Sequence, residues 1–318
     1  MDGFALFLQL AIQMGTPFLL ATLGGIICEK SGHLNLGIEG MMMMGAYAGF
    51  IAALKTSSAI LGAGAALLCG ALGAFIYAFI TITLKGNQVV TGFALATFGT
   101  GIANFLGKPY TATILPPEVT ATLGVKELPL LKNIPFLGTV LFRQDVLVYA
   151  SLLLAVVMFV YIKYTRFGLA LRMVGEDTST ADASGVNVTS YKYVHVCIGG
   201  ALCGLAGGYL SLVYVPYWQD NITAGMGWIA VGLIVFSAWN PLKAVGACWL
   251  FGILKALAIK FQSFSFTVFG INVTVASQIL DMLPYILSIV VLVIAAITSR
   301  NRSVGPGRLG MPYFREDR

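Results

Sequence analysis

The chain has 318 residues, of which 58% are hydrophobic and 10% are charged. Its mean hydropathy of +0.87 exceeds what a soluble domain can bury, so the composition excludes an ordinary soluble enzyme and predicts an integral membrane protein. The net charge of +6 does not indicate nucleic-acid binding, because the basic residues are scattered and form no patch. The five cysteines show no Cys-x-x-Cys spacing, and we expect neither a metal site nor a cofactor.

Apolar segments of membrane-spanning length recur along the chain. A spanning helix needs about 20 apolar residues, and segments near this length predict an all-α integral membrane protein, a polytopic bundle of about 8–10 transmembrane helices. Pro17 and the glycines between residues 24 and 45 would permit one broken or re-entrant helix. The segments are 4–27, 36–54, 59–84, 89–107, 145–164, 193–215, 226–240, 244–260 and 280–299.

Basic residues indicate how this bundle lies in the membrane. Lys and Arg are enriched in cytoplasmic loops, and they gather in and beside residues 165–192 and in the tail 300–318. Both stretches are therefore predicted to be cytoplasmic, in a multi-pass protein of the cell membrane. The remaining residues 1–299 form the predicted transmembrane domain, with the proline-rich stretch 108–144 as its main external loop.

Glu39 is the most informative single residue, because residues 36–51 are otherwise apolar or small. A charged side chain at membrane depth costs roughly 2.5–3.5 kcal/mol on insertion scales, so it persists where it faces a packed interior, a partner or a water-filled path. Asn35 lies four residues earlier and is predicted to share its helix face. Glu39 is therefore predicted to act either in transport or in a structural pair inside the bundle.

Other polar residues follow one face of the fourth apolar segment. Thr97, Thr100 and Asn104 have helical spacing and, near the aromatic rings of Phe98 and Trp228, are suited to lining a polar path. The alternative is that the polar groups bond across packed helices while the aromatic rings face lipid. The candidate path residues are Asn35, Glu39, Thr97, Phe98, Thr100, Asn104 and Trp228.

Small residues recur every four positions in several segments, for example at 62–74 and 200–208. Such stripes allow helices to pack closely in membranes. The alternative is that the glycines provide flexibility for a conformational change. The pattern favours packing.

The polar stretch 175–188 has the pattern of a short capped helix. Asp177 or Thr178 can cap its start, Ser179 and Asp182 have capping-box spacing, and Gly185 suits the position after the last turn. A small cytoplasmic helix of this kind can fit into a groove on a motor protein. An ordinary solvated loop is the alternative interpretation.

Several phrases together resemble a known family. They are Asn-Leu-Gly-Ile-Glu-Gly at 35–40, Arg-Phe-Gly at 166–168, Gly-Glu-x-x-x-x-Ala-x-x-x-Gly-Val-Asn-Val at 175–188, and glycine- and tryptophan-containing runs at 199–208 and 225–241. Their wording and order are similar to the membrane permeases of ABC importers for simple sugars, nucleosides and branched-chain amino acids. The 35–40 phrase and the compact length look most like the nucleoside (guanosine-type) branch.

The resemblance implies a permease subunit that forms the translocation path for a nucleoside, with purine nucleosides the first choice. Import of a sugar such as ribose, or of a branched-chain amino acid, is the alternative within the family. The resemblance also implies a cytoplasmic ATPase, a second and unlike permease subunit, and an external substrate-binding lipoprotein. In this family the 175–188 phrase contacts the ATPase, which assigns coupling to Gly175, Glu176, Asp177, Ala181, Ala183, Ser184 and Gly185.

The chain carries no G-x-x-x-x-G-K-[ST] phosphate loop, so any ATP-driven motor is a separate polypeptide. It also shows no motif of a hydrolase or metalloprotease, and we expect a transport subunit and not an enzyme. An ion-coupled secondary transporter that uses Glu39 as its ion or proton site is a further alternative.

Overall fold

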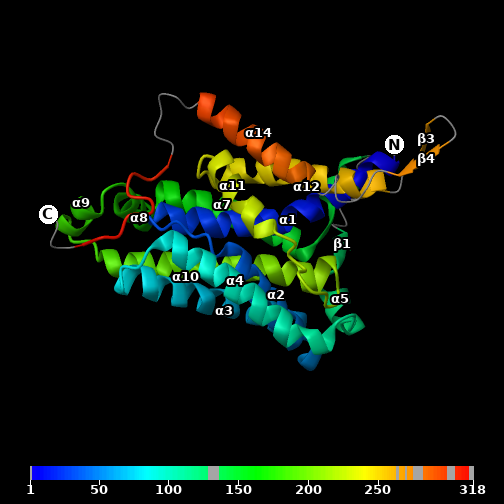
Figure 1. The fold of residues 1–318 in the computed structure, drawn as a ribbon, viewed down its shortest axis with the longest axis horizontal. Helices are drawn as coiled ribbons and strands as arrows, with labels where there is room; N and C mark the ends of the chain where they lie inside the picture. The colour runs from blue at the N-terminus through cyan, green and yellow to red at the C-terminus, as the bar shows by residue number, and fades with distance from the viewer. Residues whose placement is uncertain are drawn as a thin grey trace.

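The computed structural model describes residues 2–127, 136–262, 265–268, 271–274, 282–298 and 305–314. Long helices lie side by side along one axis (Figure 1), which confirms the predicted all-α class. They are α1 (Asp2–Lys30), α2 (Ile38–Thr56), α3 (Ala59–Ala78), α4 (Gln88–Gly107), α7 (Val146–Tyr164), α10 (Val188–Tyr209), α11 (Met226–Phe236), α12 (Pro241–Gln262) and α14 (Leu283–Thr298). The helices α3 and α10 continue into π-helical turns, η1 (Phe79–Thr83) and η3 (Leu210–Tyr214).

Each predicted apolar segment coincides with one of these long helices. Within the described ranges, six helices are long and apolar enough to cross a membrane, namely α1, α3 with η1, α4, α7, α10 with η3, and α12. The other three differ in kind. The helix α2 carries Glu39 and Lys55, α11 has 11 residues, and α14 has 16.

Short elements occupy the two ends of the bundle (Figure 1). One end carries α8 (Arg166–Glu176) and α9 (Thr178–Ala183). The opposite end carries η2 (Lys108–Tyr110), α5 (Pro117–Leu123), α6 (Leu137–Leu141) and two antiparallel strand pairs, β1 (Val125–Glu127) with β2 (Arg143–Asp145) and β3 (Ser265–Val268) with β4 (Ile271–Thr274). The stretch 165–192 and the described residues 108–127 and 136–144 therefore lie at opposite ends of the bundle, while residues 128–135 of the predicted external loop lie outside the described residues.

The break in the helices follows α1 and lies within the glycine-containing stretch 24–45 that the sequence indicated, whereas Pro17 stands inside a continuous α1. The chain leaves α1 at Lys30, and residues 31–37 lead to the start of α2. The backbone of Gly40 packs on Leu95 and Ala96, midway along α4. The helix α2 therefore begins inside the bundle and not at its end.

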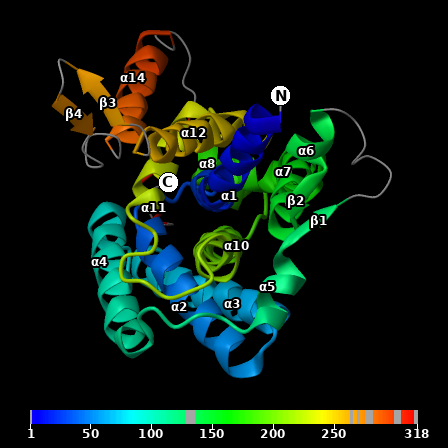
Figure 2. The same cartoon turned by 90° about the vertical axis from the view of Figure 1, so that its right-hand side faces the viewer.

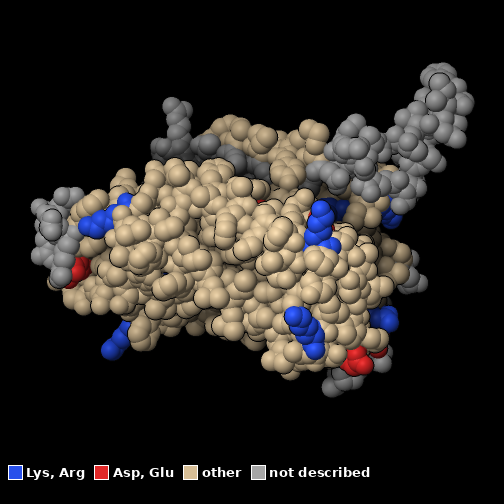
Figure 3. Space-filling model, turned by 60° about the horizontal axis from the view of Figure 1, so that its bottom comes forward, with Lys and Arg blue, Asp and Glu red and all other residues tan. Residues whose placement is uncertain are grey.

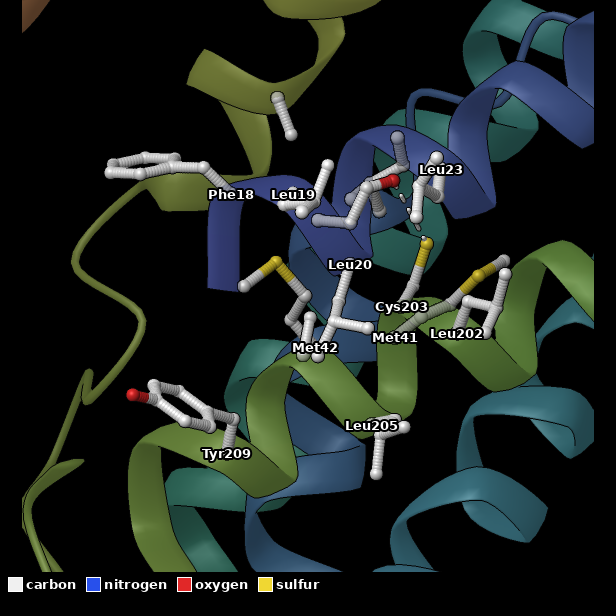
Figure 4. Packing of buried hydrophobic residues seen from close by; sticks show 14 of the residues in the cluster. Phe18, Leu19, Leu20, Leu23, Met41, Met42, Leu202, Cys203, Leu205 and Tyr209 are labelled. Carbon is white, nitrogen blue, oxygen red and sulfur yellow. Dashed lines mark hydrogen bonds between the residues drawn. The ribbon is translucent and has the colours of Figure 1, made fainter. Parts of the chain in front are cut away.

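The core lies where α1, α2 and α10 meet, and α10 occupies the middle of the bundle (Figure 2). In this core the aliphatic and sulfur-containing side chains of the three helices interdigitate, among them Leu20, Leu23, Met41, Met42 and Cys203 (Figure 4). Their close packing removes apolar surface from any solvent and supplies the dispersion contacts that hold membrane helices together.

Glycines allow α2, α3 and α10 to approach until their backbones touch. A methyl group on Gly45 would overlap the backbone of Gly204, and one on Gly70 would overlap the backbones of Gly200 and Gly204. The small-residue stripes are therefore packing surfaces, the first of the two interpretations.

Charged side chains gather toward the ends of the molecule. In the face shown in Figure 3, Lys, Arg, Asp and Glu lie near the two ends, and the broad band between them carries almost none. Many large apolar side chains are exposed on the helices that form this band, such as Leu68, Leu72 and Leu153. An apolar belt of this kind matches the hydrocarbon layer of a membrane.

The glycine contacts predict a clear difference between two Gly→Ala variants of α3. We expect Gly70→Ala to lower the free energy of unfolding by about 1–3 kcal/mol, because the added methyl group overpacks the contact with α10. Gly64→Ala is the matched control, since nothing lies within 4 Å of the added methyl group. Thermal unfolding of the detergent-purified protein measures both. Equal melting temperatures for the two variants would show that the contact does not hold the bundle.

Candidate functional site

The carboxylate of Glu39 lies where two helices begin inside the bundle. Glu39 is in the first turn of α2, and its side chain is 7% exposed. Its Oε1 accepts hydrogen bonds from the Thr223 hydroxyl (2.5 Å) and the Gly225 N–H (3.0 Å), and its Oε2 accepts one from the Gly227 N–H (2.6 Å). Because Gly225 is the N-cap residue of α11, Glu39 satisfies the N–H groups at the start of that helix.

The chain permits this contact only with glycine at two positions. Gly225 has a φ of +78°, which turns the backbone into α11. A Cβ atom at Gly227 would lie 2.6 Å from the Cα of Glu39, so α11 can approach α2 this closely only without a side chain there. The first turn of α11 is thus built to meet the Glu39 carboxylate. This arrangement corresponds to the structural pair that was one of the two roles predicted for Glu39.

Asn35 does not share a helix face with Glu39, contrary to the prediction, because α2 begins only at Ile38. Asn35 is 1% exposed and its Oδ1 accepts a hydrogen bond from the Gly37 N–H (2.9 Å). Its amide nitrogen lies 3.5 Å from the sulfur of Met41. Asn35 therefore shapes the turn that leads into α2.

The polar face of α4 faces the segment that precedes and begins α11. Asn104 exchanges two hydrogen bonds with Asn221: its Nδ2 donates to Asn221 Oδ1 (2.8 Å), and its Oδ1 accepts from the Asn221 N–H (3.0 Å). On the same face of α4, Phe93 stacks on Trp228, with ring centroids 5.1 Å apart and an interplanar angle of 29°. These two contacts bracket the positions of Thr97 and Thr100.

The two threonines differ from the residues that bracket them. Thr97 is exposed and its hydroxyl donates to the backbone oxygen of Phe93 (3.1 Å), while Thr100 is half-buried. A Thr hydroxyl that donates to its own helix keeps lone pairs for a further donor. The structure therefore places a strip with hydrogen-bonding capacity between an aromatic pair and an asparagine pair.

Phe98 lies on a different face of α4. It lines an apolar hollow of about 450 Å³ between α3 and α4, together with Ile76 and Ile80. The partner of Trp228 is instead Phe93, which the sequence interpretation did not single out. The helical period of 3.6 residues could have placed Phe93 with Thr97 and Asn104, since the spacings are four and eleven residues.

The predicted capped helix is confirmed as α9 (Thr178–Ala183). The Asp177 carboxylate accepts hydrogen bonds from the N–H groups of Ser179 (3.1 Å) and Thr180 (3.4 Å) and from the Thr180 hydroxyl (2.6 Å). These bonds, first among them the one from the Thr180 hydroxyl, hold the pKa of Asp177 below its usual range. The residue after the helix, Gly185, has a φ of +82°.

The predicted coupling residues have different environments. Ala183, Ser184 and Gly185 are exposed at the tip of α9, whereas Ala181 is fully buried in a cluster with Val174 and Val188. The earlier part of the phrase also packs inward, because the backbone of Gly175 lies against the backbone oxygen of Lys30. Asp177 is half-buried, and Glu176 is exposed like the tip of α9, so Glu176 and the tip are the predicted coupling residues available to a partner.

A C-terminal strap, residues 305–314, holds this end of the bundle together. The N–H of Arg308 donates to Gly175 O (3.0 Å), and the N–H of Gly310 donates to Gly32 O (3.2 Å). The N–H of Gly307 also donates to the Glu176 carboxylate (3.0 Å). Residues 300–318 were predicted only as a basic tail. The Gly-Pro-Gly sequence at 305–307 could have indicated an ordered turn in this tail.

An apolar helix bundle with interrupted helices that meet at depth, and with a small exposed helix at one end, defines the membrane-spanning subunit of a transporter. A family model described as "Branched-chain amino acid transport system / permease component" matches residues 7–296, and the chain belongs to this family. It is therefore a multi-pass permease subunit of an ABC importer in the cell membrane. It is a transport subunit and not an enzyme, and the family implies a separate ATPase.

The chain is similar over nearly its whole length to several named permeases. It is 36% identical, over 97% of both chains, to a Haloferax volcanii protein that carries the provisional name glucose ABC transporter permease protein TsgC13. It is 31% identical to the guanosine ABC transporter permease protein NupQ of Bacillus subtilis, over 95% of this chain and 94% of the other. It is 29% identical to the nucleoside ABC transporter permease protein NupC of Lactococcus lactis, over 94% of both.

The fold also matches a solved structure, an ABC transporter provisionally described as metal-chelate type in an inward-facing conformation. The TM-score is 0.51 at 13% sequence identity, covering 91% of this chain and 85% of the other. At this identity the match shows the fold alone.

The contacts of Glu39 predict a graded loss of stability. We expect Glu39→Ala to lower the free energy of unfolding by about 3 kcal/mol or more, because it leaves two buried donors and one part-buried donor without an acceptor, at about 1–3 kcal/mol for each buried donor. Glu39→Gln keeps one acceptor oxygen and should lose less. Glu118→Ala, which removes an exposed carboxylate on α5, is the control. The measurements are thermal unfolding and folded yield of the purified protein, and a Glu39→Ala variant that matches wild type in both would contradict the assignment.

Proposed function

We propose that this permease forms the path by which an ATP-driven importer carries nucleosides, with purine nucleosides foremost. The observation that carries the proposal is the strip on α4 between the Phe93–Trp228 stack and the Asn104–Asn221 pair. A nucleoside presents a flat aromatic base and a ribose with hydroxyl groups, and this strip offers an aromatic pair beside threonine hydroxyls. The similarity to relatives named for guanosine and nucleoside transport supports the same substrate class.

A sugar is the second candidate, because the relative named for glucose transport has 36% identity to this chain. A sugar shares the ribose hydroxyls of a nucleoside but has no planar base. The hydroxyl groups of Thr97 and Thr100 would serve either substrate. The two candidates therefore differ in how much binding depends on the aromatic stack. Ring stacking favours the nucleoside, since Phe93 is 50% exposed beside Trp228 and offers a free π-face.

The contacts of Glu39 speak against an ion-coupled secondary transporter. A proton-coupled site needs a carboxyl group that exchanges its proton during transport. The Glu39 carboxylate is 7% exposed, and both of its oxygens accept hydrogen bonds from α11 and the segment before it. These bonds engage both oxygens in a packed contact and leave the group little access to water.

Under this proposal, the two ends of the bundle contact different partners. The cytoplasmic ATPase would contact the exposed tip of α9, at the end that carries residues 165–192 and the tail. The external substrate-binding lipoprotein would dock at the opposite end, on residues 108–144. A second, unlike permease subunit would complete the pore, and the bundle would alternate its access around the α4 strip as ATP binding moves α9.

Uptake by the reconstituted complex tests the substrate. In proteoliposomes that contain the whole complex with ATP and no ion gradient, we expect ATP-dependent uptake of labelled guanosine that excess adenosine reduces and excess glucose does not. We expect Trp228→Leu to weaken the apparent affinity for guanosine about 2–10-fold, because it removes a stacking ring. Trp249→Leu is the matched control, since Trp249 is also half-buried but lies on α12 among apolar residues.

The possible results of this uptake assay distinguish a wrong substrate from a wrong class of transporter. Glucose uptake without guanosine uptake would reject the nucleoside and leave the importer in place. Uptake driven by a pH gradient in the absence of ATP would reject both the nucleoside proposal and the ATP-driven importer.

The environment of α9 selects the variant that tests coupling to the ATPase. Ala183→Trp places a bulky ring on the exposed tip, so we expect loss of ATPase co-purification and of uptake while folded yield stays at the wild-type level. Ala181→Trp is unsuitable, because Ala181 is buried and its replacement would disrupt the cluster with Val174 and Val188. Ala121→Trp, at an exposed position at the opposite end, controls for the added ring. Normal co-purification of Ala183→Trp would remove α9 from the interface.

A further inference from the structure

A hollow at the α9 end of the bundle has no role in the proposed path. Its volume is about 420 Å³, and it lies between η1, α9, the first turn of α10 and the C-terminal strap. Two lysines line it, Lys85 and Lys192, and a third cation, Arg308, is close enough to act electrostatically on Lys192. The one carboxylate among the lining residues is Asp182, which accepts a hydrogen bond from the Tyr313 hydroxyl (3.1 Å). The lining therefore carries more positive than negative charge.

Lys192 is the unusual member of this lining. Its side chain is 3% exposed, yet its ammonium group makes no hydrogen bond or ion pair with any described residue. Among the described residues it lies near the ring of Tyr313, with Nζ 5.8 Å from the ring centroid. A buried ammonium without a counterion is costly, and a distant ring compensates for little of this cost. The hollow beside it is the place from which an anion can compensate the charge.

The start of α10 adds hydrogen-bond donors to the same hollow. Asn187 caps this 22-residue helix by accepting a hydrogen bond from the N–H of Ser190 (3.1 Å). Val188 and Thr189 line the hollow, and their N–H groups have no acceptor among the described residues. Free N–H groups at a helix N-terminus, together with the helix dipole, favour a negative charge.

His33 contributes from the other wall. It is 2% exposed, and its Nδ1 is buried with no hydrogen-bond partner in the described part of the chain. Burial, followed by the nearby Lys192 charge, lowers the pKa of His33 to about 3, so the ring is neutral near pH 7. A neutral ring adds no charge of its own to the hollow.

We propose that this hollow binds the phosphoryl group of an anionic ligand, supplied by an anionic phospholipid headgroup or by a soluble phosphate. A phosphoryl group has the oxygen acceptors needed to meet two lysine ammonium groups and the helix N–H groups at once. The hollow is open to the surface and has room for such a group. The ligand would also touch Asn187, in the turn that links α9 to α10, while the Asp182 carboxylate on the lining opposes its charge and accepts the Tyr313 hydroxyl instead.

Binding to the purified complete complex tests the site in two arms. The first arm measures binding of labelled inorganic phosphate by equilibrium dialysis. The second counts phosphatidylglycerol adducts by native mass spectrometry, with phosphatidylcholine as the zwitterionic comparison. We expect wild type to bind in at least one arm, and the arm that responds identifies the source of the phosphoryl group.

Three variants test whether binding depends on the lysines that line the hollow. We expect Lys192→Met to weaken binding by about tenfold or more, since a charge-assisted bond is lost. Lys85→Gln should weaken it a few-fold, and because Lys85 is exposed this variant decides the matter if Lys192→Met fails to fold. Lys163→Met is the control, because it removes an exposed lysine at the end of α7 that does not line the hollow.

Absence of binding in both arms would overturn the proposal. So would wild-type affinity in both Lys192→Met and Lys85→Gln, or an equal loss in Lys163→Met. The assay scores binding to the permease whatever substrate it carries, so failure of nucleoside uptake would leave this result unaffected.

Discussion

The structure depends on one carboxylate that meets the ends of two interrupted helices inside the bundle. Backbone N–H groups at membrane depth have no water to bond with, so a helix that starts there needs an internal acceptor. Glu39 in the first turn of α2 provides it for α11, and the Thr223 hydroxyl and the N–H groups of Gly225 and Gly227 in turn offset the cost of placing a charge there. The N–H groups at the helix break need an acceptor, and the buried carboxylate needs hydrogen-bond donors. Each therefore stabilises the other.

This contact fixes the geometry of the candidate path. The segment before α11 holds Asn221 and Ala224 at positive φ, a conformation that persists only where the surroundings determine it. The Asn104–Asn221 pair and the Glu39 contacts determine it from two sides. With the start of α11 held in this way, Trp228 stands opposite Phe93 on α4. The aromatic stack is thus positioned by polar bonds on both sides of it.

The sequence predicted the parts of this arrangement that depend on local pattern. Apolar length located the long helices, and capping chemistry located α9. The energetic cost of a membrane carboxylate marked Glu39, but its partners are 184–188 residues away in the chain, and no local rule connects them. Helical period likewise placed Phe98 on some face of α4. The predicted segment 36–54 lies close to the observed α2, but the face of α4 that meets Trp228 is set by how the helices pack, which no local pattern gives.

Both ends of α11 are held by buried carboxylates, and this connects the path to the coupling end. Just beyond the C-terminal end of α11, the indole N–H of Trp239 donates to Glu29 in the last turn of α1 (2.6 Å). The same turn of α1 ends at Lys30, against which Gly175 of α8 packs, and α9 in turn packs on α8. Contiguity alone does not establish coupling, which requires an element with two discrete positions. Under the proposed function, α11 is the element through which such coupling would run, because this 11-residue helix has directional polar bonds near each end, one set toward the candidate path and one toward the coupling end.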